Sequence, residues 1–155
     1  MSDIGVELLK LENVTKSFNG KVVLDNISVT LKTGEILGLI GKSAAGKSVL
    51  IHMIRGSEGY KPDSGKILYH VRRCPACNHL DTPTSEGVCP HCGKEMNDEW
   101  IDMWALKERD ATRSSLHMRI SIMLQRTFAL FGDDTVLENI YEAMPEGMED
   151  PDKVK

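Results

Sequence analysis

Aromatic residues are scarce in this sequence, and it contains no long apolar run. Two Trp, three Tyr and three Phe are its only aromatic side chains among 155 residues, a small supply for a surface that stacks on nucleic-acid bases. No stretch approaches the roughly 18 consecutive apolar residues of a membrane-spanning helix. The first ten residues carry Asp3 and Glu7 where a secretory signal would be positively charged, and they lack its apolar segment. We therefore expect a cytoplasmic protein that does not insert directly into a membrane.

The charge balance lacks a strong excess of either sign. Lys and Arg total 19 against 23 Asp and Glu, which gives a formal net charge of −4. This balance favours neither a general nucleic-acid-binding protein nor a polybasic membrane-binding one. Hydrophobic residues make up 41% and charged residues 27% of the chain, which excludes a wholly disordered or collagen-like protein. A chain of 155 residues is close to one average domain and can bury a core.

Only four cysteines are present, and all of them lie in two Cys-x-x-Cys pairs. In a reducing compartment this arrangement favours metal binding over disulfides. Two such turns can close a tetrahedron of four thiolates, a geometry that suits Zn²⁺. Two redox-active dithiols or an iron–sulfur cluster are the rival interpretations. The candidate zinc ligands are Cys74, Cys77, Cys89 and Cys92.

The segment 72–97 is predicted to be a separate zinc-ribbon module. It holds three of the six prolines and few apolar residues, so that a metal would replace the missing core. A closed site of four thiolates is structural in role, and the near-neutral charge of the segment favours protein docking over nucleic-acid binding. His79 and His91 are expected to be bystanders, because four cysteines already complete the ligand shell.

Hydrophobic patterning predicts a small antiparallel sheet followed by parallel α/β structure. The Asn19-Gly20 pair is typical of a hairpin turn, and the apolar run 36–40 is typical of a strand buried on both faces. Further strands are expected at 6–14, 22–24, 27–31, 66–71 and 119–124. Helices are expected at 49–54, ending near Gly56, at 98–118, and at 135–144, where Thr135 and Glu138 form a capping box.

Trp100 and Trp104 are four residues apart and would share one face of the expected 98–118 helix. Packing against the main domain is the plain interpretation of this pair. A partner-facing anchor is the alternative, because tryptophan is enriched at interface hot spots.

Residues 41–48 fit the pattern G-x-x-x-x-G-K-[ST] of a phosphate-binding loop. Such a loop curls so that successive backbone N–H groups point at one anion, and the following helix adds its positive end. The positive charge of the Lys47 ammonium would contact the β- and γ-phosphates, and the Ser48 hydroxyl would bind Mg²⁺. An ordinary tight turn in an α/β unit is the alternative interpretation.

The residues around this loop resemble the start of an ABC-type ATPase domain. The resemblance rests on the runs 11–20 and 23–28, on Gly34-Glu35-Ile36, and on the later segments 122–125 and 135–140. It implies that Phe18 stacks on adenine and that Gln125 reaches both Mg²⁺ and the attacking water, with Lys47 as its catalytic partner. The implied ATP-binding set is Phe18, Val23, Gly41, Ser43, Ala44, Ala45, Gly46, Lys47, Ser48 and Val49.

The sequence also departs from the pattern of this family. Ala44 stands where glycine is usual, and it would be strained if the position needs positive φ. Val49 stands where threonine is common. We find no L-S-G-G-Q signature and no Walker B carboxylate, so we expect this chain alone to bind ATP without efficient hydrolysis.

The resemblance implies a mixed α/β fold of the P-loop NTPase class. It would be the N-terminal part of an ABC ATPase, with an antiparallel β subdomain and an inserted zinc ribbon. The expected division is 1–71 with 117–155 as the nucleotide-binding domain, 72–97 as the ribbon and 98–116 as a helical connection. A second ABC domain, in the same longer chain or in a dimer mate, would complete the site.

The ribbon and the stretches 54–62, 69–75 and 123–130 resemble the family of component A2 of the methyl-coenzyme M reductase system of methanogenic archaea. That resemblance implies a soluble ATPase with two ABC domains that supports ATP-dependent reductive activation of the reductase. Its partners would then be the reductase and its activation complex. A zinc-ribbon adaptor without catalysis, or the ATPase subunit of a membrane transporter, are the alternatives.

Overall fold

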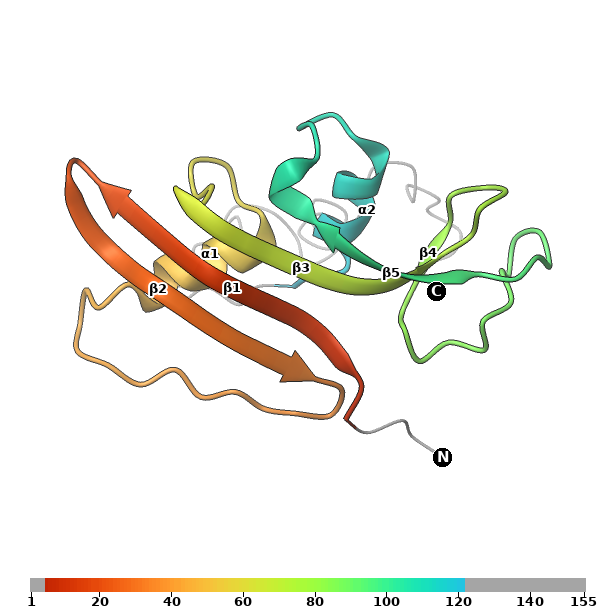
Figure 1. Cartoon of the computed structure of the whole chain (residues 1–155), viewed down its shortest axis with the longest axis horizontal. Helices are drawn as coiled ribbons and strands as arrows, with labels where there is room; N and C mark the ends of the chain where they lie inside the picture. Colours follow the sequence, from red (N-terminus) through yellow and green to blue (C-terminus); the bar gives the residue numbers. More distant parts are fainter. Residues whose placement is uncertain (1–4, 122–155) are drawn as a thin grey trace, which may run out of the picture. The chain divides into compact units, whose positions relative to one another are not determined.

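The computed structural model describes residues 5–121, which form an antiparallel sheet with two helices (Figure 1). The sheet has five strands in the order β2-β1-β3-β4, and β5 also pairs with β3. The elements are β1 (Glu7–Phe18), β2 (Lys21–Lys32), α1 (Lys47–Arg55), β3 (Ser64–Arg73), β4 (Leu80–Asp81), β5 (Asn97–Asp102), the 3₁₀ turn η1 (Met103–Ala105) and α2 (Ala111–Met118).

The first hairpin confirms the turn predicted at Asn19-Gly20. Both residues have positive φ, 50° and 78°, as a two-residue turn between twisted strands requires. The two short strands expected at 22–24 and 27–31 are one continuous strand, β2. Asn26 interrupts the ladder with a φ of 51°, and its side-chain oxygen accepts a hydrogen bond of 2.8 Å from Asn13 Nδ2 on β1. A bulge therefore replaces the expected break.

One face of the sheet carries the core, and both helices cover that face. Alternate residues of β1 and β3 are buried on it, together with Leu50 and Met53 of α1 and Leu116 of α2. Gly65, the second residue of β3, has a φ of 86°, and a Cβ there would overlap the carbonyl oxygen of Asn13. Only glycine fits this position, where β3 pairs with β1 beside its bulge.

The C-terminus of α1 confirms the stop predicted near Gly56. Gly56 N and Ser57 N donate to the carbonyls of Met53 and His52, at 3.1 and 2.9 Å, which is the Schellman arrangement. The Met53 carbonyl also accepts from Trp104 Nε1 at 3.1 Å. The neighbouring Ile54 carbonyl accepts from the buried Tyr69 hydroxyl. Aromatic side chains of β3 and η1 thus donate hydrogen bonds to two carbonyls in the last turn of α1.

The apolar run 36–40 is not a strand. It lies in the connection from β2 to α1, and Ile36 and Ile40 are 96% and 100% exposed. A strand buried on both faces needs neighbouring strands and covering layers. Within residues 5–121 every strand pair is antiparallel and none involves this run.

The helix expected at 98–118 is wrong for its first half. Residues 97–102 form β5, which pairs with β3 from Leu68↔Asp102 to Arg73↔Asn97. The helix α2 begins only at Ala111, after Asp110 has capped it by accepting from Thr112 N at 2.8 Å. Pairing with the long β3 edge outweighs the weak helical pattern of this segment.

The two tryptophans consequently do not share a helix face. Trp104 lies in η1 and is buried against α1, as the plain interpretation predicted. Trp100 lies on β5 and is 37% exposed, with its ring stacked on His70 at 4.7 Å between centroids.

Several expectations fall on residues that the structure does not describe. These are Gln125, the helix at 135–144 and the second half, 122–124, of the strand expected at 119–124. Its first half, 119–121, is not a strand, because Arg119 ends α2 in a helical conformation. Among the described residues, no helix is long and apolar enough to cross a membrane.

Candidate nucleotide site and cysteine cluster

The glycine-bordered loop 41–48 curls into the first turn of α1. Ala45 N donates to the Lys42 carbonyl at 3.3 Å, and Leu50 N to the Gly46 carbonyl at 2.9 Å. Ala44 and Gly46 both have positive φ, 62° and 83°. The conditional expectation for Ala44 is therefore met, because alanine holds a left-handed conformation here.

The Lys47 side chain folds back over this loop. Its Nζ donates to the carbonyls of Gly41 and Lys42, both at 2.7 Å. The first turn of α1 contains no acidic residue, so neither the ammonium nor the positive end of the helix is neutralised there. The loop residues 41–45 are exposed. The arrangement is an open, positively charged curl that can accept an anion.

Gly46 fixes the loop against β2. A Cβ at this position would meet the Val23 carbonyl and the Leu24 side chain, both at 2.9 Å. The structure thus brings Val23, which the family resemblance places in the ATP-binding set, next to the phosphate loop. Ser48 is exposed and Val49 is half-buried in the first turn of α1.

Phe18 ends β1 and is not a core residue. Its side chain is 38% exposed. Its ring meets the Tyr60 ring edge-on, with 6.1 Å between centroids and 74° between planes. Lys16 Nζ lies 5.1 Å from the Phe18 centroid. An exposed aromatic ring at this position can offer a stacking surface for a base.

The loop between α1 and β3 is tied to the end of β1 by the Asp63 clamp, which is formed by Lys16, Ser17, Lys61 and Asp63. Asp63 accepts from Ser17 N at 2.6 Å and from Lys16 Nζ at 3.1 Å. Lys16 also donates to the Lys61 carbonyl at 2.6 Å. The Ser17 N–H and the Lys16 ammonium lower the pKa of Asp63 below its ordinary value. Sequence reasoning missed Lys16, Tyr60 and Asp63, because their spacing matches no motif.

The four cysteines form one cluster at the other end of β3. Their sulfur atoms all lie within 4.8 Å of one another. Three of the Sγ–Sγ distances are 3.4 Å (Cys74–Cys92), 3.5 Å (Cys77–Cys89) and 3.8 Å (Cys77–Cys92). These distances far exceed the bond length of a disulfide. A tetrahedron with Zn–S bonds of about 2.3 Å has edges of about 3.8 Å, so the cluster fits one such ion.

The two halves of the cluster repeat one backbone design. Cys74 N donates to the His79 carbonyl, and Asn78 N donates back to the Cys74 carbonyl, both at 2.9 Å. In the second half, Cys89 N donates to the Lys94 carbonyl and Gly93 N to the Cys89 carbonyl, both at 2.8 Å.

Asn78 and Gly93 occupy equivalent places in the two halves. Both have left-handed backbones, with φ of 58° and 70°. The sequence signal for this repeat is the Cys-Pro-x-Cys pattern followed by Asn or Gly.

The thiols of the cluster do not share one acidity. Burial raises the pKa of Cys74, but the backbone N–H groups of Cys77 and Ala76 outweigh it and lower that pKa to about 6. At Cys77 the His79 N–H lowers the pKa, but the neighbouring sulfurs and burial together outweigh it and raise the value to about 12. Like charges oppose one another in this small space, so a bound cation would be needed for all four to ionise.

His79 and His91 lie beside the cluster with ring centroids 4.3 Å apart. Neither belongs to the group of four ligand atoms that the described residues bring together.

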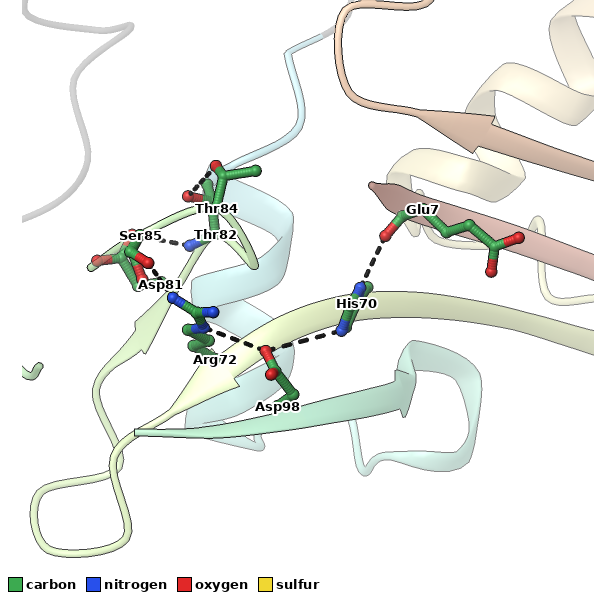
Figure 2. A network of polar contacts seen from close by, with 8 residues as sticks. All are labelled: Glu7, His70, Arg72, Asp81, Thr82, Thr84, Ser85 and Asp98. Atoms are coloured by element: carbon green, nitrogen blue, oxygen red, sulfur yellow. Dashed lines mark hydrogen bonds and ion pairs between the residues drawn. The ribbon is translucent and has the colours of Figure 1, made fainter. Parts of the chain in front are cut away.

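A polar network anchors the cysteine segment to the sheet (Figure 2). Arg72 of β3 donates to Asp98 of β5 at 3.1 Å and to the Ser85 carbonyl between the two cysteine pairs. Asp98 also lies 3.8 Å from His70 Nε2. His70 Nδ1 is 2.8 Å from the Glu7 carbonyl on β1, so that nitrogen carries the proton.

The two candidate sites lie at opposite ends of β3. Asp63, which accepts a hydrogen bond from Ser17 next to Phe18, precedes the first residue of β3. Cys74 follows the last residue of β3. Ten residues at about 3.3 Å each separate them by roughly 30 Å. Figure 1 shows the cysteine loops extending from the end of β3 away from α1. The cluster therefore forms no part of the phosphate loop.

Known proteins are similar to most of the chain. The family model described as ABC transporter matches residues 24–154. The chain is 53% identical over 138 residues to an uncharacterized ABC transporter ATP-binding protein of Methanocaldococcus jannaschii, a match that covers 88% of this chain and 25% of that protein.

Shorter matches reach import proteins. The chain is 48% identical over 66 residues to the methionine import ATP-binding protein MetN of Rhizobium johnstonii, covering 43% of this chain and 18% of that protein. It is 47% identical over 62 residues to the spermidine/putrescine import ATP-binding protein PotA of Mycoplasma capricolum, covering 40% and 17%. The chain thus spans about a quarter or less of the length of these relatives. From the match over 24–154, the chain belongs to the ABC transporter ATPase family, as part of an ATP-binding domain.

Proposed function

We propose that this chain holds MgATP between the Phe18 ring and the phosphate loop. One observation carries the proposal: Lys47 lies folded over a curled loop at the unneutralised N-terminus of α1. A triphosphate would take the place of the loop carbonyls as the partner of the Lys47 ammonium. The proposed contact set is Phe18, Val23, Gly41, Ser43, Ala44, Ala45, Gly46, Lys47, Ser48 and Val49.

Magnesium would be held beside the phosphates. The Ser48 hydroxyl is exposed in the first turn of α1, where a P-loop serine reaches the ion. Gln125 is the second proposed ligand by family resemblance, and it would also orient the attacking water. The ion neutralises developing charge during phosphoryl transfer.

We propose Zn²⁺ for the cysteine cluster. Four thiol ligands at tetrahedral spacing, in two repeated turns, suit a soft ion without redox chemistry. Its role would be to hold the ribbon together, because the cluster's own buried core comprises only Cys74, Cys89 and Met96.

The whole protein, by this proposal, couples ATP binding and hydrolysis in paired ABC domains to movement of a partner. Resemblance to the A2 component family suggests reductive activation of methyl-coenzyme M reductase. The names of the shorter relatives, which are import ATP-binding proteins, favour a transporter subunit instead. A nucleotide-binding adaptor without catalysis is the third candidate.

ATP turnover by the whole protein separates the catalytic candidates from the adaptor. We expect turnover that Lys47→Ala abolishes, while Lys42→Ala, which changes an exposed lysine of the same loop, retains it. Absence of turnover in the wild-type protein, with MgATP still bound, would favour the adaptor. Co-purification with a soluble reductase complex or with membrane subunits then decides between the two ATPase roles.

A further inference from the structure

We infer that Tyr60 is a positioning residue that sets the Phe18 ring, and thereby the base of the bound nucleotide. The inference rests on the proposed function and deepens it. No sequence motif singled out Tyr60, which follows Gly59 in the loop between α1 and β3.

Two neighbouring side chains hold the Phe18 ring. Phe18 is the last residue of β1, and its side chain is 38% exposed, so the core does not fix its orientation. The Tyr60 ring meets it edge-on at 6.1 Å and 74°, the favoured geometry for two aromatic rings. The Lys16 ammonium lies 5.1 Å from the Phe18 centroid, within cation–π range. Among the described contacts, these two act directly on the ring.

Tyr60 is itself held by α1 and by its own loop. Its ring stacks on His52 with 4.7 Å between centroids and 21° between planes. His52 belongs to α1, and its Nδ1 lies 3.2 Å from the Ser57 hydroxyl. The Tyr60 backbone N–H donates to the Ser57 carbonyl at 3.2 Å. Tyr60 is therefore fixed through both its ring and its backbone.

Stacked rings connect the two ends of the proposed nucleotide site. The rings of Phe18, Tyr60 and His52 form a continuous chain from the end of β1 to α1. The same helix begins at Lys47, which lies over the phosphate loop. These three rings therefore connect the Phe18 ring, on which the base would stack, to α1, the helix that would position the phosphates. The Asp63–Lys16 contact at 3.1 Å ties the loop of Tyr60 to β1 from the other side.

A purely structural role for Tyr60 predicts a different outcome from positioning. Tyr60 is half-buried and packs against the core, so its loss could loosen the whole loop. General loosening would weaken binding of every phosphate ligand. Positioning of Phe18 affects only ligands that carry a base. Tripolyphosphate, which has the phosphates of ATP without the base, separates the two.

The test compares calorimetric dissociation constants of MgATP and magnesium tripolyphosphate on the whole protein. The variants are wild type, Tyr60→Leu, Tyr60→Phe, Phe18→Leu and the double leucine variant. We expect Tyr60→Leu to weaken MgATP binding about 3- to 10-fold, as loss of one aromatic pair implies. Its tripolyphosphate affinity should stay within about twofold of wild type, and Tyr60→Phe should restore MgATP binding.

Tyr60→Leu should also add little to the loss caused by Phe18→Leu, because both changes act on one platform. Unchanged MgATP affinity in Tyr60→Leu, equal losses for both ligands, or additive losses in the double variant would overturn the inference. Failure of the wild-type protein to bind MgATP would instead overturn the proposed function.

Discussion

At the scale of single residues, Ala44 holds a conformation that glycine adopts at lower cost. Its φ is 62° within the phosphate loop. A left-handed alanine costs about 1–2 kcal/mol relative to glycine. Replacing it with glycine removes this strain, but glycine loses more conformational entropy on folding, which offsets part of the gain. We therefore predict that Ala44→Gly raises the free energy of unfolding by up to about 1 kcal/mol. Denaturant unfolding measures it.

The adjacent Ala45 supplies the matched control for this prediction. Ala45 is not among the residues with positive φ, so Ala45→Gly should lower stability slightly. Equal effects of the two substitutions would contradict the assignment of strain to Ala44.

Asp63 gives a pH dependence at the same scale. Its folded-state pKa is lowered by the Ser17 N–H and Lys16, so it stabilises the fold at any pH above the ordinary value of 3.8. That contribution is lost as the pH falls through the lower folded pKa. We predict that Asp63→Asn lowers Tm by a constant amount from pH 7 to about pH 5, and that the difference shrinks below about pH 4.

Thermal melts of both proteins across this range provide the measurement. Glu58→Gln, a change at an exposed acid of the same loop, is the control and should leave Tm unchanged. A Tm difference between Asp63→Asn and wild type that grows on acidification would refute the proposed clamp.

At the scale of elements, the end of α1 depends on donors from outside the helix. Trp104 Nε1 donates to the Met53 carbonyl, which Gly56 N also reaches. Trp104→Phe removes one bond without leaving that carbonyl unpaired, so it should cost about 1 kcal/mol. Trp104→Ala also empties the core beneath α1 and should cost about 3–5 kcal/mol.

Trp100 is the matched control for these losses. It lies on the other, half-exposed face of β5, and Trp100→Phe should therefore cost less than about 1 kcal/mol. Denaturant unfolding of the three variants and the wild-type protein checks the ranking. A larger loss from Trp100→Phe than from Trp104→Phe would show that the helix end does not need its indole donor.

The cysteine ribbon is the second element with a direct test. We predict one zinc ion per wild-type chain by elemental analysis, and its loss in Cys77→Ser, because three thiolates no longer close the tetrahedron. His91→Ala, adjacent to Cys92 but outside the cluster, should retain the ion. Equal zinc loss in His91→Ala, or iron in place of zinc, would contradict the assignment.

Local patterns predicted those elements whose structure depends on neighbours in sequence. The Asn19-Gly20 turn, the Gly56 stop and the grouping of the four cysteines all follow from short-range geometry. The strand at 97–102 could not be predicted this way, because it depends on the edge that β3 offers. The run 36–40 has the composition of a buried strand, but strands are stabilised by partners that a single segment does not contain.

The same distinction, between features set by sequence neighbours and features set by the fold, applies to the candidate site. The phosphate loop and Phe18 were found from a motif and a resemblance. The residues that support Phe18 come from three separate elements, β1, α1 and the loop before β3, and meet only in the fold.

At the scale of the whole molecule, the described part has two ends with different chemistry. The phosphate loop, Phe18 and the Asp63 clamp lie near the start of β3, and the cysteine cluster lies beyond its last residue. This separation follows from β3, which alone among the strands of residues 5–121 pairs with β1, β4 and β5.

The dissociation constant of MgATP, measured by titration calorimetry, tests the central claim most directly. The wild-type protein should bind one MgATP per chain, and Lys47→Ala should bind it about 10- to 100-fold more weakly, as loss of a charged hydrogen-bond donor implies. Lys42→Ala, which removes an exposed side chain of the same loop, should stay within about twofold of wild type. Undetectable binding by the wild-type protein, or equal affinity of Lys47→Ala, would contradict the account.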